Sequence, residues 1–146
     1  MEYYFAPMEG VTGAEYRAVH HRHFPGVDRY YMPFITPTQD RVFTPRELRN
    51  IAPERNVGYC AVPQLLTKNA GDFNWAAGEL WAMGYDEVNL NLGCPSGTVT
   101  AKGKGAGMLA DLEGLDRFLD GIFSAARGKI SVKTRLGLRD PEEIFP

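Results

Sequence analysis

Cys94 is the residue with the clearest chemical potential in this 146-residue chain, because it follows a strand-like segment that has one polar face. Apolar and polar residues alternate over residues 86–92, and successive side chains of a strand point to opposite faces. The polar face carries Glu87, Asn89 and Asn91. Amides on one face, followed by Gly-Cys-Pro, are typical of a scaffold that holds a reactive thiol. A lone cysteine is also commonly buried and inert, so other residues must decide between these interpretations.

Polar side chains also stand at the ends of other strand-like segments. In a parallel β/α array, ligands bind at the C-terminal ends of the strands. The first segment delivers Pro-Met-Glu-Gly at residues 7–10, the third ends near Gln64, and the last carries Lys133 and Arg135 on one face. Burying an unpaired lysine or arginine is strongly unfavourable, so the two cations favour a site over a core. An amide, a thiol and two cations are therefore expected to converge, which favours a functional role for Cys94.

Strands alternate with helices along the chain, which predicts parallel strands joined by crossovers. The strands are expected over residues 3–6, 30–35, 61–66, 86–92 and 130–135. The helices are expected over residues 12–23, from 44, over 69–83, over 109–126 and from 141. A capping box formed by Thr12 and Glu15 is expected to start the first helix. Five strands fit an open doubly wound sheet or the first five units of a (β/α)8 TIM barrel, and the helix that starts at the C-terminal end favours the barrel.

Composition limits the classes of function. The length fits one domain, and the formal net charge of −2 means that any nucleic-acid contact must come from a local patch. The two cysteines, Cys60 and Cys94, lack the spacing of metal ligands, so no metal site is expected. No signal peptide or long apolar run is visible. The sequence therefore predicts a soluble, cytoplasmic protein with no membrane contact.

A glycine-rich segment, residues 102–107, follows Cys94 closely and contains two lysines. Its glycines permit close backbone approach, and its lysines are suited to phosphate groups. The segment does not match a phosphate-binding fingerprint, because no strand ends immediately before it. A flexible lid without a phosphate role is an equally good interpretation.

Four segments of the chain, in this order, resemble motifs of the tRNA-dihydrouridine synthases. They are Ala-Pro-Met-Glu-Gly-Val-Thr at 6–12, Asn-Leu-Asn-Leu-Gly-Cys-Pro at 89–95, Gly-Lys-Gly-Ala-Gly at 103–107 and Val-Lys-Thr-Arg-Leu-Gly at 132–137. The resemblance implies an FMN-dependent TIM barrel followed by a small helical domain. It also implies reduction of uridine in tRNA to 5,6-dihydrouridine, with NADPH as the electron donor.

The resemblance assigns roles to individual residues. Four are implied to contact the flavin: Pro7, Met8, Gln64 and Lys133. Two are implied to face the uracil: Asn91 and Arg135. Cys94 is implied to be the general acid, which protonates carbon 5 of the uracil after reduced FMN delivers hydride to carbon 6.

The sequence differs from the family pattern in its extent. The resemblance implies that the last three or so strands and the helical domain, which in the family carry the flavin phosphate site and much of the tRNA contact, are missing from residues 1–146. We therefore expect residues 1–146 to be the N-terminal part of an FMN-binding barrel domain, which alone binds FMN weakly and does not turn over tRNA. Exposed sheet edges and apolar faces also predict self-association of this chain.

Two other interpretations remain open at this stage. The first is another FMN barrel that reduces a small pyrimidine or an enone. The second is an inactive half-barrel fragment that associates with itself. The sequence does not identify the subfamily or the tRNA position that would be modified.

Overall fold

The structure is a computed structural model that describes residues 1–144, within which short parallel strands alternate with helices. The strands are β1 (Tyr4–Phe5), β2 (Arg29–Tyr31), β3 (Ala61–Val62), β4 (Gln64–Leu65), β5 (Glu87–Asn91) and β6 (Lys129–Lys133). The α-helices are α1 (Ala14–His23), α2 (Pro45–Ile51), α3 (Ala70–Ala82), α4 (Gly97–Thr100) and α5 (Leu112–Phe123). The 3-10 turns are η1 (Pro53–Arg55), η2 (Gly105–Ala110) and η3 (Pro141–Ile144). Every strand pair is parallel, so the predicted α/β class is confirmed.

The strands form two sheets, with the orders β1-β2-β3 and β4-β5-β6. The single strand predicted over residues 61–66 was wrong, because it divides at Pro63 into β3, which pairs with β2, and β4, which pairs with β5. Proline has no N–H to continue a ladder, which accounts for the division. The strand predicted over residues 30–35 is interrupted at Pro33 in the same way, and only an isolated bridge joins Ile35 to Leu65.

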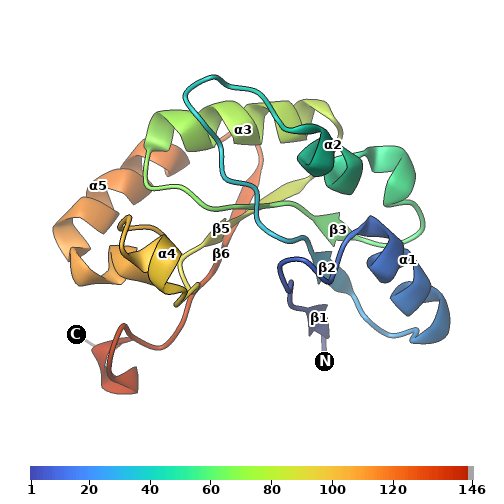
Figure 1. Cartoon of the computed structure of the whole chain (residues 1–146), viewed down its shortest axis with the longest axis horizontal. Helices are drawn as coiled ribbons and strands as arrows, with labels where there is room; N and C mark the ends of the chain where they lie inside the picture. The colour runs from blue at the N-terminus through green and yellow to red at the C-terminus, as the bar shows by residue number, and fades with distance from the viewer. Residues whose placement is uncertain (145–146) are drawn as a thin grey trace.

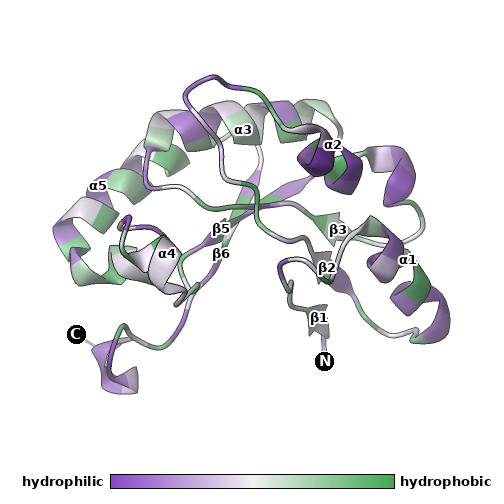
Figure 2. Ribbon diagram, viewed as in Figure 1, coloured by the Kyte–Doolittle hydropathy of each residue, from purple (hydrophilic) through white to green (hydrophobic). Residues whose placement is uncertain are grey.

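The main core lies between the strands and the helices. Helices α5, α3, α2 and α1 form an arc, with the strands on its inner side (Figure 1). The apolar face of β5, with Val88 and Leu90 fully buried, packs against α3 and α5. Phe73 of α3 and Phe118 of α5 meet edge to face with their ring centroids 6.3 Å apart. Hydrophobic and hydrophilic residues alternate along both helices (Figure 2), as expected for helices with one buried side.

The last two predicted helices differ from the structure. The helix predicted over residues 109–126 begins only at Leu112, where the Asp111 carboxylate accepts a hydrogen bond from the N–H of Gly114 at 2.9 Å. The residues before it form η2, in which glycine weakens a regular helix. The helix predicted from Pro141 is the 3-10 turn η3, and its continuation lies outside the described residues. No helix within residues 1–144 combines the length and apolar character needed to cross a bilayer.

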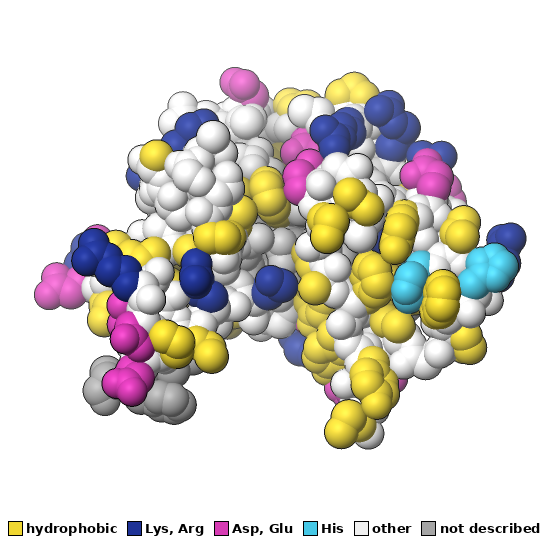
Figure 3. Space-filling model, turned by 60° about the horizontal axis from the view of Figure 1, so that its bottom comes forward, with side chains coloured by type: hydrophobic (Ala, Val, Ile, Leu, Met, Phe, Trp, Pro, Cys, Tyr) yellow, Lys and Arg dark blue, Asp and Glu magenta, His cyan; other side chains and the backbone are white. Residues whose placement is uncertain are grey.

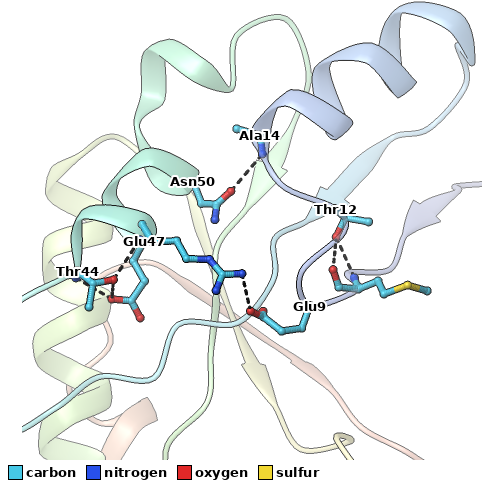
Figure 4. A network of polar contacts seen from close by, with 8 residues as sticks. Glu9, Thr12, Ala14, Thr44, Glu47 and Asn50 are labelled. Carbon is cyan, nitrogen blue, oxygen red and sulfur yellow. Dashed lines mark hydrogen bonds and ion pairs between the residues drawn. The ribbon is translucent and has the colours of Figure 1, made fainter.

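The capping box predicted at Thr12 and Glu15 was wrong. Helix α1 begins at Ala14, and the Thr12 side chain is 4 % exposed and faces the preceding turn instead. Thr12 Oγ1 accepts a hydrogen bond from the N–H of Met8 at 2.9 Å and donates to its carbonyl at 3.1 Å (Figure 4). The N–H of Ala14 donates to Asn50 Oδ1 at 3.1 Å. A side chain from α2 therefore accepts a hydrogen bond from a backbone N–H group at the start of α1.

The same Thr-x-x-Glu pattern does form a capping box at the start of α2. The N–H of Glu47 donates to Thr44 Oγ1 at 3.2 Å, and the N–H of Thr44 donates to Glu47 Oε2 at 2.8 Å (Figure 4). Thr44 is exposed and free to turn toward its own helix, whereas Thr12 is held by its contacts with the preceding turn. Packing around the threonine thus decides which of the two patterns caps a helix.

A charge cluster around the buried Glu87 lies at the N-terminal ends of the strands. The Glu87 carboxylate, in a residue that is 4 % exposed, lies 2.6 Å from Arg29 Nη1 and 2.8 Å from Lys129 Nζ. The hydroxyl of Tyr31 donates to Glu87 at 3.2 Å. Burial alone raises the pKa of Glu87, but hydrogen bonding and charge from Lys129, together with the charge of Arg29, outweigh it and lower the pKa. The cluster connects β2, β5 and β6 and contributes to stability.

We expect Glu87→Gln to lower the free energy of unfolding by about 1–3 kcal/mol at pH 7, because its partners lose a charged acceptor. The folded-state pKa of Glu87 is lowered, so its contribution is full above the unfolded pKa of about 4.3 and is lost as pH falls toward the folded value. Urea unfolding at several pH values measures the difference, which should shrink below about pH 4. Glu113→Gln is the control, since Glu113 is exposed and 3.8 Å from Arg117. Equal stability of Glu87→Gln and wild type at pH 7 would contradict this role.

Candidate active site

A chain of buried amides runs across the polar face of β4, β5 and β6. Gln64 Nε2 donates to Asn89 Oδ1 at 2.8 Å, and Asn91 Nδ2 donates to Gln64 Oε1 at 2.8 Å. Asn89 Nδ2 donates to Ser131 Oγ at 2.8 Å, which extends the chain to β6. The exposed fractions of Gln64, Asn89 and Asn91 are 0 %, 1 % and 7 %. Each amide at this depth needs a partner, and the network supplies one to each.

Strand register explains why these side chains meet. Gln64 of β4 lies opposite Asn89 of β5, and Asn89 lies opposite Ser131 of β6. Partners in neighbouring parallel strands point to the same face of a sheet. Asn89 and Ser131 were not among the predicted site residues. The alternation over residues 86–92 placed Asn89 on the polar face, but the sequence does not reveal which residue of β6 lies opposite it.

Asn91 connects the amide network to the cysteine. Its Oδ1 accepts hydrogen bonds from the N–H of Gly93 at 3.1 Å and from the N–H of Cys94 at 3.0 Å. Cys94 is free of any disulfide and half-buried, so the thiol stands on a turn that the strand-end amide holds in place. In this structure Asn91 is thus a positioning residue for the turn that carries Cys94.

The two predicted cations lie at the end of β6. Lys133 is the last residue of that strand and lies opposite Asn91, whereas Arg135 comes two residues later, and both are exposed. Neither has a carboxylate within 4 Å among the residues that the structure describes. β6 ends the second sheet, and Val132 on it is 40 % exposed. The cations are therefore available to an anionic or polar ligand.

Pro7 and Met8 follow β1, the edge strand of the first sheet, and lie outside the strand itself. Met8 is 61 % exposed, and its backbone is fixed through both hydrogen bonds to Thr12. No hydrogen bond joins Pro7 or Met8 to the amide network within residues 1–144. The structure thus brings Gln64, Asn91 and Cys94 into one hydrogen-bonded unit, while Met8 stands apart from it with an exposed side chain.

A cavity of about 370 Å³ spans both sheets on the polar side. It is bounded by Tyr4, Ala6, Tyr31, Glu87, Asn89, Lys129, Ser131, Val132 and Lys133. These residues come from β1, β2, β5 and β6 and from the residue after β1. The space beside the amide network is therefore lined by hydroxyl, amide and ammonium groups and by the carboxylate of Glu87, which can bind a polar ligand.

The glycine-rich segment packs directly against the cysteine turn. Gly105 has φ +56°, and a β-carbon there would lie 2.9 Å from the carbonyl oxygen and 3.1 Å from the β-carbon of Cys94. The N–H of Ala106 donates to the Cys94 carbonyl at 3.1 Å. The sequence left open whether the glycine-rich segment binds a phosphate group or forms a flexible lid. In the structure Gly105 lets the segment approach the backbone of Cys94 and support its turn.

The comparison with protein families agrees with this arrangement. The family described as dihydrouridine synthase matches residues 4–145, which contain both sheets and the cysteine turn. The chain belongs to the dihydrouridine synthase family. The resemblance drawn from the four sequence motifs is confirmed by this match.

Relatives within the dihydrouridine synthase family extend beyond this chain. It is 28 % identical over 138 residues to "Probable tRNA-dihydrouridine synthase 1" of Synechocystis sp., covering 94 % of this chain and 38 % of the relative. It is 32 % identical over 143 residues to "tRNA-dihydrouridine(16) synthase" of Ralstonia nicotianae, covering 92 % of this chain and 43 % of the relative. A third relative, "Probable tRNA-dihydrouridine synthase" of Staphylococcus epidermidis, is 42 % identical over 62 residues, which are 42 % of this chain and 18 % of the relative. The chain thus spans about two-fifths of the length of the two relatives, from Synechocystis and Ralstonia, that match almost all of it.

Proposed function

We propose that the complete protein containing this chain reduces uridine in tRNA to 5,6-dihydrouridine in the cytoplasm. The observation that carries the proposal is the family match over residues 4–145 together with a half-buried thiol that the amide of Asn91 holds at a strand end. The relatives from Synechocystis and Ralstonia are named for this activity on tRNA. A buried amide network that positions one thiol suits a reaction in which the thiol must meet a substrate atom in a fixed orientation.

In this proposal residues 1–146 are the N-terminal part of a TIM-barrel catalytic domain, with the later strands and a helical tRNA-binding domain contributed by the rest of the protein. Four successive parallel β/α units and a fifth strand, β6, support it, if β3 and β4 are counted as one strand divided at Pro63. Within the described residues β1 and β6 each have a partner on one side only, so further strands can join at both edges. The shares of the relatives that the chain covers, 38 % and 43 %, fit this assignment.

The residues lining the polar side fit FMN as a cofactor. Lys133 lines the cavity and is exposed, and an ammonium group there suits the polar edge of an isoalloxazine. Pro7 and Met8 would lie along the ring, and Gln64 retains one N–H and one lone pair beyond its two hydrogen bonds in the network. FMN reduced by NADPH would supply the hydride that adds to carbon 6 of the uracil.

The chain's own residues would supply the proton and the orientation. Cys94 would hold a proton on its sulfur and release it to carbon 5 of the uracil, on the face opposite the incoming hydride. Asn91 fixes the backbone of the cysteine turn and would lie next to the uracil, and Arg135 would donate hydrogen bonds to the base. The target base must leave the tRNA stack to reach such a site.

The test is to incubate the complete protein with NADPH and an unmodified tRNA transcript, and to measure dihydrouridine by mass spectrometry. We expect dihydrouridine in the tRNA and none from free uridine or uracil. Activity on free uracil or on a small enone, without activity on tRNA, would replace the proposal by the second candidate, an FMN barrel for small substrates.

Exposed apolar side chains favour self-association of the chain when it is produced alone. Tyr16, Val19 and Phe24 of α1 and its C-terminal end are 43 %, 55 % and 61 % exposed, and hydrophobic side chains gather over this region in Figure 3. Apolar surfaces of this kind are normally covered by another element or chain. We expect residues 1–146 alone to elute from a sizing column as an oligomer without bound flavin. A yellow monomer would contradict this part of the proposal.

A further inference from the structure

Three lysines from two loops gather beside the cysteine turn. Lys68 lies in the loop that connects β4 to α3, and Lys102 and Lys104 lie in the loop between α4 and α5. A β-carbon on Gly103, which separates the last two lysines, would lie 3.4 Å from Lys68 Nζ. The amine of Lys68 therefore lies close to the backbone of Gly103, between Lys102 and Lys104. We call these three residues the lysine cluster.

The lysine cluster forms no ion pair within residues 1–144. No carboxylate lies within 4 Å of its ammonium groups in the part of the chain that the structure describes. Burial lowers the pKa of Lys104, Lys102 and Lys68 lower it further, and only Asp72 acts in the opposite direction. Three like charges with no carboxylate within 4 Å in the described residues repel one another, and an anionic ligand would relieve that repulsion.

Hydrogen bonds fix the lysine cluster relative to Cys94. The N–H of Gly103 donates to the carbonyl of Thr100 at 2.8 Å, and the N–H of Lys104 donates to the carbonyl of Val99 at 3.2 Å. Two residues after Lys104, the N–H of Ala106 donates to the Cys94 carbonyl at 3.1 Å. Lys102 and Lys104 are therefore joined to the cysteine turn through the glycine-rich segment, and Lys68 packs against the same segment at Gly103, so a ligand bound by the lysines lies next to the cysteine turn.

We propose that the lysine cluster binds backbone phosphates of the RNA strand that carries the target uridine. This inference rests on the proposed function, and it names a contact that holds the strand while its base enters the site. The chain has a net charge of −2, so attraction for RNA must come from a local group of cations such as this one. Cations spread over two loops suit a strand with consecutive phosphates better than the single phosphate of FMN.

The test measures the dissociation constant of the complete protein for a tRNA transcript, by fluorescence anisotropy over a range of salt concentrations. We compare wild type with the triple variant Lys68→Gln, Lys102→Gln and Lys104→Gln. Loss of two to three phosphate contacts should weaken binding about 10- to 100-fold and reduce the slope of log K against log salt by about 2. Single variants of Lys68 and Lys102, which are exposed, test the same point if the triple variant folds poorly.

The control is the double variant Arg22→Gln and Arg127→Gln. It removes two positive charges from exposed positions that precede β2 and β6, at the N-terminal ends of the strands. The control should leave the salt slope unchanged. An unchanged slope and affinity in the lysine variants would overturn the inference. A raised flavin dissociation constant or NADPH KM, with RNA binding intact, would also overturn it and assign the cluster to a cofactor phosphate. A wild-type protein that binds tRNA through these lysines but forms no dihydrouridine would instead contradict the proposed function alone.

Discussion

Replacing Cys94 by alanine in the complete protein is expected to lower dihydrouridine formation by about 10²- to 10⁴-fold, the range for loss of a general acid. The thiol takes no part in the amide network, because Asn91 Oδ1 binds the backbone N–H groups of Gly93 and Cys94. Flavin content and tRNA affinity should therefore stay close to those of wild type. Mass spectrometry of the tRNA product measures dihydrouridine formation, and the absorbance spectrum of the protein measures flavin content.

The matched control for this substitution is Cys60→Ala. Cys60 is also a free cysteine, but it is exposed and precedes β3 at the N-terminal ends of the strands. Its removal should leave dihydrouridine formation unchanged. Wild-type activity of Cys94→Ala, or an equal loss in both variants, would show that Cys94 is not the proton donor.

The substitution Gly105→Ala is expected to cause the largest loss of dihydrouridine formation after Cys94→Ala, although the side chain it adds is only a methyl group. The residue has φ +56°, a conformation that costs an alanine about 1–2 kcal/mol. The new β-carbon would lie 2.9 Å from the carbonyl oxygen of Cys94, so the cysteine turn must move. We expect the free energy of unfolding to fall by about 2–4 kcal/mol and dihydrouridine formation to fall about 10- to 100-fold.

Gly97→Ala is the control for a methyl group added in the same region. Nothing lies within 4 Å of a β-carbon at Gly97, which begins α4 and is exposed. Its effect on unfolding should stay within about 0.5 kcal/mol, and its activity should match that of wild type. If Gly105→Ala were as active and stable as Gly97→Ala, the packing of the glycine-rich segment against Cys94 would not support the turn.

Hydrophobic periodicity predicted most of the α/β framework, because buried faces leave a regular pattern in the sequence. The alternation over residues 86–92 corresponds to β5, and the apolar stripe after residue 109 corresponds to α5. Helix and strand ends were less predictable. Thr12 and Thr44 stand in the same local motif, yet only Thr44 caps a helix, since Asn50 from α2 satisfies the start of α1. Such a contact depends on tertiary packing that the local sequence does not contain.

The candidate site was predictable in its residue types but not in its connections. The polar ends of the strand-like segments in the sequence indicate Gln64, Asn91, Lys133 and Cys94. Asn91 donates a hydrogen bond to Gln64 and accepts one from the N–H of Cys94, and both bonds follow from strand register and amide orientation, which no spacing rule fixes. Gln64 is fully buried within the amide network, and its hydrogen bonds to Asn89 and Asn91 use half of its hydrogen-bonding capacity.

The central claim is that Cys94, held by Asn91, donates a proton to uridine in the step that forms dihydrouridine. The most direct test is the rate at which tRNA re-oxidises the reduced, flavin-loaded complete protein, followed by stopped-flow absorbance in a single turnover. Wild type should be re-oxidised by tRNA, and Cys94→Ala should be re-oxidised more slowly by a factor of about 100 or more, although NADPH reduces both proteins equally fast. Equal rates of re-oxidation by tRNA in the two proteins would contradict the claim.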